Sequence, residues 1–126
     1  KSLEEAFENA AYALTDVMID HKKVKAVKEK KISTSSEDLK SALYDFLEQF
    51  LILQDSEGFL LRSVNSIKVY CNPKNGNVKI SASVSGDSNI KRYSGEIDTH
   101  IKAVTYADML IEKKAEGYLI QVILDI

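Results

Sequence analysis

The chain of 126 residues changes its hydrophobic period once, and this change constrains the fold more than any other feature. Up to Gln54, apolar residues recur every three or four positions, which is the spacing of one face of an α-helix. After Gly58 they alternate with polar residues, as in a half-buried strand. The sequence therefore predicts an α+β fold in which the helices come first and most strands follow.

Two helices are predicted, each with a recognisable amino end. The first runs from Ser2 to about Ile19, and Ser2 with Glu5 has the spacing of a capping box. The second begins at Ser35 and Asp38 and ends near Gln54. The residues expected to face the core are Leu3, Phe7, Ala10, Leu14 and Val17 in the first helix, and Leu39, Leu43, Phe46, Leu47, Phe50 and Leu53 in the second.

The remaining periodic segments predict strands. A short strand is expected within His21–Thr34, and Asn72–Gly76 has the residues of a tight hairpin turn. Residues 86–95 are expected to form a loop or an irregular edge. The other strands are expected at Ile67–Cys71, Val78–Val84, Ile101–Lys113 and Tyr118–Ile126. We predict a single domain over residues 1–126, a two-layer sandwich with two helices on one face of a mainly antiparallel sheet.

Composition excludes several classes of protein. Seventeen basic residues against nineteen acidic ones give a formal charge of −2, and Cys71 is the lone cysteine, so neither a disulfide framework nor a Cys-rich zinc module is expected. The alternation around Cys71 predicts a small core residue. No apolar run reaches the roughly 18 residues of a membrane span, and we recognise no signal peptide, so a cytoplasmic location is expected.

No catalytic constellation is recognisable. His21 lies in a lysine-rich segment and His100 at the start of a strand, and neither has the surroundings of a catalytic dyad or triad. A nucleophile elbow and a glycine-rich phosphate loop are both missing from the sequence. We therefore do not expect an enzyme.

A basic segment lies between the two helices. Six lysines against Glu29 give 6 − 1 = +5 within ten residues. The segment can contact RNA phosphates or an acidic protein surface, although it carries no aromatic residue or arginine for base stacking. A solvated loop and edge strand protected by lysines is the simpler explanation and the one we favour. Its lysines are Lys22, Lys23, Lys25, Lys28, Lys30 and Lys31.

The two last residues concentrate oxygen ligands. Asp125 contributes a side-chain carboxylate and Ile126 an α-carboxylate. Neighbouring carboxylates are stable when they are solvated, protonated or bridged by a cation, and oxygen ligands suit Ca²⁺ or Mg²⁺ better than Zn²⁺. A solvated end and a cation site therefore both remain open.

Several segments together resemble the archease family over essentially the whole chain. Glu37–Leu39 is similar to the start of the family's second helix. The Val-Lys-Ala-Val/Ile-Thr-Tyr signature is matched by Ile101–Tyr106, and the family's carboxyl end by Val122–Ile126. Ser2–Ala11 resembles the opening of the family's first helix, and Val17–Asp20 resembles its end.

Two features depart from the family pattern. The family's amino-terminal strand, with His-Thr-Ala-Asp, does not precede the first helix, so one acid of the family's metal site is not found here. His100 stands where an acid is usual, and Ala107 where a histidine is common.

The resemblance implies an archease/SHS2-like fold and a non-catalytic helper of an RtcB-type tRNA-splicing RNA ligase. Such a helper promotes guanylylation of the ligase and its multiple turnover, with the ligase as partner, tRNA involved indirectly and no membrane. The resemblance carries the family's metal site onto Asp125 and the terminal carboxylate of Ile126, with Ca²⁺ as the first expectation and Mg²⁺ or Mn²⁺ as alternatives. It assigns ligase activation to Lys102.

Overall fold

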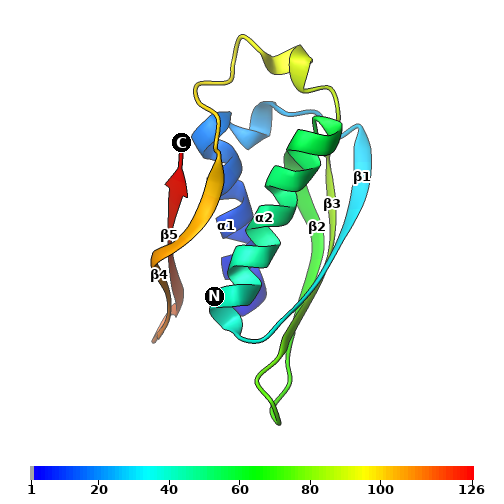
Figure 1. Ribbon diagram of the computed structural model, residues 1–126. Coiled ribbons are helices and arrows are strands. Elements are labelled where there is room, and N and C mark those ends of the chain that lie inside the picture. Colours follow the sequence, from blue (N-terminus) through cyan, green and yellow to red (C-terminus); the bar gives the residue numbers. More distant parts are fainter. Residues whose placement is uncertain (1) are drawn as a thin grey trace.

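The computed structural model describes residues 2–126 and confirms the predicted α+β class (Figure 1). Two α-helices, two short 3-10 helices and five strands make up this part of the chain. In chain order they are α1 (Leu3–Met18), η1 (His21–Lys23), β1 (Lys28–Ser36), α2 (Leu39–Glu57), β2 (Leu60–Cys71), β3 (Val78–Asp87), η2 (Ile90–Tyr93), β4 (Ala103–Lys114) and β5 (Gly117–Asp125). No helix among residues 2–126 has the length and apolarity needed to cross a membrane.

The strands divide between two sheets, and in this respect the prediction of a single sheet was wrong. One sheet has three strands in the order β1-β3-β2, and the other contains only β4 and β5. All pairs are antiparallel, as predicted. The predicted hairpin joins β2 to β3, with Gly76 in its turn at a φ of 77°.

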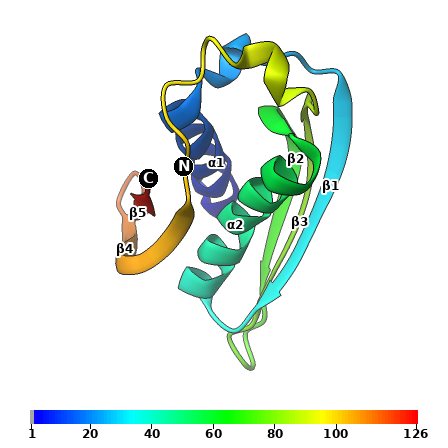
Figure 2. The same cartoon turned by 45° about the horizontal axis from the view of Figure 1, so that its top comes forward.

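The two helices form a layer between the two sheets (Figures 1 and 2). Each helix contacts both sheets: α1 packs on β2 and β5, and α2 packs mainly on β1 and β4, with further contacts to β2 and β3. The reason is that α1 carries apolar residues beyond a single stripe. Phe7, Ala11 and Leu14 are buried in the core, while Ala10 and Val17 line the side that faces β5. A helix that is apolar on two sides needs cover on both.

The caps explain where the helices begin and end. Ser2 accepts a hydrogen bond from the Glu5 amide at 3.1 Å, as predicted. At α2 the capping residue is Asp38, whose carboxylate accepts from the Ser41 amide at 2.8 Å. Ser35, predicted to take part in this cap, instead lies in β1. α2 ends at Glu57, three residues after the predicted end at Gln54, and Gly58 caps it in the left-handed conformation.

One hydrophobic core joins the helices to both sheets. The predicted core residues Phe7, Leu14, Leu43, Phe46, Leu47 and Phe50 are all buried. Val17 and Cys71 are exceptions to the prediction, since Val17 is 39% exposed and Cys71 is exposed. Cys71 lies at the end of β2, where the hairpin projects beyond the helices and nothing covers it (Figure 1).

A buried polar network fixes the segment after β3, where the sequence predicted an irregular loop. The Tyr93 hydroxyl donates to Asp87 at 2.8 Å and accepts from the Lys25 amide at 3.0 Å. Arg92 lies 3.4 Å from the same carboxylate. Burial raises the pKa of Tyr93, so the phenol stays protonated and can donate. The network ties η2 to the segment before β1 and directs the chain toward β4.

Candidate functional site

Lys102 and the carboxyl-terminal residues meet at one end of the two-stranded sheet. Ala103 is in register with Asp125 where β4 begins and β5 ends. One residue earlier, the Lys102 amide donates a hydrogen bond to the Asp125 carbonyl oxygen at 2.6 Å. The structure thus brings together two residues that the sequence analysis singled out separately.

The side chains at this end of the sheet are open to solvent. Residues of β5 alternate between half-buried and exposed positions, and Asp125 falls on the exposed side. Lys102 is exposed, and Ile126 is 62% exposed. A carboxylate in this position can take up an ion or contact a partner without any change of the core.

The carboxyl-terminal end of α1 lies beside the last residue of the chain in both views (Figures 1 and 2). The Asp98 amide donates to the Met18 carbonyl at 2.9 Å and holds the segment before β4 against this helix end. The last turn of α1 contains no basic residue. The dipole gives a helix carboxyl end a partial negative charge, and Lys22 and Lys23 of η1 follow this end in the sequence.

The donors at the carboxyl end fit a hard cation but form only part of a coordination shell. Asp125 and the Ile126 carboxylate offer oxygen atoms, which Ca²⁺, Mg²⁺ and Mn²⁺ prefer. Among residues 2–126, one set of three His, Cys, Asp or Glu side chains has its ligand atoms within 4.8 Å of one another, and Asp125 is not in it. Within the described residues, Asp125 therefore belongs to no ready-made set of three such ligands, and water and backbone carbonyls can supply further oxygens.

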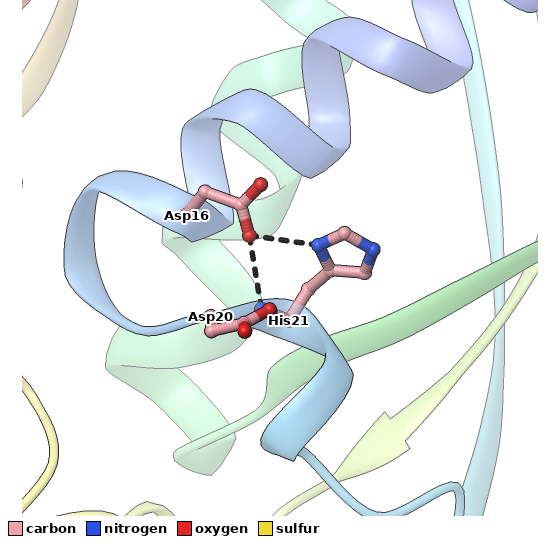
Figure 3. A group of neighbouring side chains, drawn as sticks. All are labelled: Asp16, Asp20 and His21. Carbon is pink, nitrogen blue, oxygen red and sulfur yellow. Dashed lines mark hydrogen bonds and ion pairs between the residues drawn. The ribbon is translucent and has the colours of Figure 1, made fainter.

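That set of three consists of Asp16, Asp20 and His21, between α1 and η1 (Figure 3). His21 Nδ1 lies 2.7 Å from Asp16 Oδ1, which also accepts from the His21 amide at 2.9 Å. Asp20 caps η1 by accepting from the Lys22 amide at 3.0 Å. The imidazole stacks on Tyr12, with ring centroids 4.4 Å apart.

Local hydrogen bonds account for this arrangement. Asp16 pairs with His21 and Asp20 acts as a cap, so both carboxylates already have partners that explain where they lie. In the sequence, His21 reads only as a residue of a lysine-rich segment, and these contacts were not predicted. Two acids four residues apart across a helix end, the second followed directly by histidine, were the signal that could have revealed the cluster.

The structure does not gather the predicted basic segment into one patch. Lys22 and Lys23 belong to η1. In β1, Lys28 and Lys30 point to one face and Lys31 to the other. Lys30 forms an ion pair with Glu57 at the end of α2. That contact lowers the pKa of Glu57, chiefly through the hydrogen bond from the lysine. Lys25 lies between these groups and is exposed.

The two residues that depart from the family pattern are both exposed. His100 precedes the start of β4, and Ala107 lies where the pairing of β4 with β5 shifts register. The residue after Ala107, Asp108, has a φ of 51°. Immediately before it, Tyr106 stacks on Tyr44 of α2, with centroids 4.4 Å apart and planes 6° apart. The irregular part of β4 is therefore anchored to α2 by an aromatic pair.

Comparison with known proteins gives a consistent result over the whole chain. The family model described as "Archease protein family (MTH1598/TM1083)" matches residues 1–126. The chain is similar to Protein archease of Pyrococcus abyssi, with 37% identity over 126 residues that cover 99% of this chain and 86% of the relative. It is also similar to Protein archease of Methanosarcina barkeri, with 38% identity over 128 residues that cover 100% of this chain and 84% of the relative.

A solved structure agrees with these matches. The solution structure of protein 1598 of Methanobacterium thermoautotrophicum superposes with a TM-score of 0.73 and 32% sequence identity. The match covers 98% of this chain and 85% of that chain.

Proposed function

The chain belongs to the archease family, a family of accessory proteins, and we propose on this basis that it activates an RtcB-type tRNA-splicing RNA ligase. In this proposal the protein is not itself a catalyst. It promotes guanylylation of the ligase and its multiple turnover during tRNA splicing in the cytoplasm. The observation that best supports the proposal is the main-chain hydrogen bond between Lys102 and Asp125, because it places at one end of the sheet the two residues to which the family resemblance assigns separate roles.

We further propose that the carboxyl end binds a divalent cation, Ca²⁺ by preference. The Asp125 carboxylate and the terminal carboxylate of Ile126 would hold it, and the dipole of α1, whose last turn has no basic residue, favours positive charge near its carboxyl end. Ca²⁺ takes about six to eight oxygen ligands. Water, backbone carbonyls and the aspartate of the strand that family members carry before this helix would complete the shell. A bound cation would neutralise the neighbouring carboxylates and allow them to face a negatively charged partner.

Lys102 would act through its own charge in this proposal. Its amide is engaged by Asp125, whereas its side chain is exposed at the same end of the sheet. An ammonium group there can stabilise negative charge on a nucleotide phosphate or on a carboxylate of the ligase. It cannot be a metal ligand, because a protonated amine has no lone pair and repels the cation.

The test is multiple-turnover ligation of RNA by the cognate ligase with and without this protein, across a Ca²⁺ titration. We expect the protein to raise the number of turnovers and the rate of ligase guanylylation, and chelation to abolish the effect. Equal ligation with and without the protein would refute the proposal. The alternative that the sequence left open, binding of RNA or an acidic protein through Lys22–Lys31, predicts instead that substituting those lysines removes the activity.

A further inference from the structure

The three-stranded sheet has one face that the helices do not cover. Side chains alternate across a strand, and the inward set on β3, with Val78, Ile80, Ala82 and Val84, is buried under the helices. The helices lie on one side of this sheet (Figure 1), so the side chains that alternate with this set point away from them. This outward face is therefore exposed to solvent and available to a partner.

The strand register shows which residues share that face. Lys79 of β3 is opposite Ser35 of β1 and Tyr70 of β2. Two residues further along β3, Ser81 is opposite Ser33 and Lys68. Directly opposed residues project to the same side of a sheet and lie within reach of one another. We call these six exposed residues the serine–lysine face: Ser33, Ser35, Lys68, Tyr70, Lys79 and Ser81.

The serine–lysine face is hollowed and positively charged. A depression of about 480 Å³ lies over it, and no acidic residue lines this depression. The next row of the sheet adds Lys31, opposite Ser83. Glu29 stands beyond that row and accepts a hydrogen bond from Ser83 Oγ at 2.8 Å. On a chain whose formal charge is −2, the two lysines of this face and Lys31 beside it make a locally positive surface.

The side chains match the chemistry of a nucleic-acid strand. Lysine ammonium groups neutralise phosphates, and serine hydroxyls donate to phosphate or sugar oxygens. Tyr70 is 58% exposed, so its ring presents a surface on which a base can stack. The basic segment lacked such an aromatic residue in the sequence, and the sheet supplies one by bringing β2 alongside β3.

We propose that the serine–lysine face binds single-stranded RNA, with Lys31, Lys68 and Lys79 on the phosphodiester backbone and Tyr70 stacked on a base. A single strand fits because its bases are free to stack on an exposed ring, whereas paired bases are not. This surface belongs to a different sheet from the Lys102–Asp125 contact. The inference therefore does not rest on the proposed activation of a ligase.

The test measures binding of a fluorescent oligoribonucleotide by anisotropy over a series of salt concentrations. Three phosphate contacts predict that the logarithm of the association constant falls with the logarithm of salt with a slope of about −2. The double variant Lys68→Ala/Lys79→Ala should bring the slope to about −1 and weaken binding to every sequence. Tyr70→Ala should weaken binding by about tenfold, while Tyr70→Phe, which keeps the ring, should not.

Lys113→Ala/Lys114→Ala is the matched control, because it removes the same charge from the β4–β5 turn. It should bind as the wild-type protein does, and circular dichroism should show all variants folded. Equal losses in both double variants would overturn the proposal, since the binding would then follow net charge alone. Loss confined to Lys22→Ala/Lys23→Ala would also overturn it in favour of the basic segment. The proposal is also overturned if poly-glutamate displaces the fluorescent oligoribonucleotide as strongly as unlabelled RNA does and Tyr70→Ala has no effect on binding. The partner would then be an acidic protein.

Discussion

The Lys102 amide donates a 2.6 Å hydrogen bond to the Asp125 carbonyl oxygen, so the residue before β4 is held by the last residue of β5. Both atoms belong to the main chain, which leaves the ammonium and the carboxylate free for other contacts. Substitution of either side chain keeps this bond. Side-chain variants at the two positions therefore test function separately from folding.

Asp125→Asn should abolish ligase activation while leaving the fold intact, because it keeps the shape of the side chain and removes one negative charge. The measurement is ligase guanylylation at saturating Ca²⁺, with calorimetry of Ca²⁺ binding alongside. An extension of the carboxyl terminus, which removes the terminal carboxylate of Ile126, should have the same effect. Asp55→Asn on α2 is the control. Full activation by Asp125→Asn would rule out a role for a metal at this site.

Lys102→Ala should lose ligase activation without losing affinity for metal, since an ammonium group is not a ligand. The same guanylylation assay and calorimetry measure the two properties independently. Lys113→Ala removes an equal charge from the far end of β4 and should activate normally. Wild-type activation by Lys102→Ala would show that this lysine is an ordinary surface residue.

Leu47→Ala should lower the free energy of unfolding by about 2–5 kcal/mol, the usual cost of emptying a buried leucine site. Leu47 is 1% exposed within the helix layer that joins the two sheets. Denaturation by urea, followed by circular dichroism, measures the change. A loss below about 1 kcal/mol would mean that the core collapses around the vacated volume and that Leu47 is not central to it.

Gly86→Ala should destabilise the protein strongly, because a β-carbon there would lie 1.9 Å from the Leu60 carbonyl oxygen and 2.7 Å from the Phe59 ring. Relief requires β3 to move from β2, and we expect a cost of about 3 kcal/mol. Gly95→Ala is the control, since a β-carbon at Gly95 meets no atom within 4 Å. Similar melting temperatures for the two variants would show that the close approach of these strands is unimportant.

Asp38→Ala should cost about 1 kcal/mol by removing the amino-terminal cap of α2. The hydrogen bond from the Ser41 amide lowers the pKa of Asp38 from its usual 3.8. A lowered pKa in the folded state means that this stabilisation is fully present above pH 3.8 and is lost as the pH falls through the lower value. Ser35→Ala should leave the helix unchanged. A larger effect of Ser35→Ala than of Asp38→Ala would show that the cap is misassigned.

The sequence by itself determined the elements and most of the core. Periods of 3.6 and 2 record which side of each segment is apolar, and a cap or a turn depends on residues only a few positions apart. Both helices, the β2–β3 hairpin and the burial of Phe7, Leu43 and Phe46 were therefore predictable. Asp125 was singled out by its place beside the terminal carboxylate of Ile126, whereas the role of Lys102 came only from the family resemblance.

Only the tertiary structure decided how these elements combine. Hydrophobic periodicity indicates which face of a helix or strand is buried, but not which other element buries it. It therefore could not show that the helices lie between two sheets. Nor could it show that Cys71 extends beyond the helices, that Lys30 pairs with Glu57, or that His21 lies against Asp16. The serine–lysine face was likewise decided only by the tertiary structure. Pairing between β2 and β3 sets the strand register, and this register places Tyr70 beside Lys79.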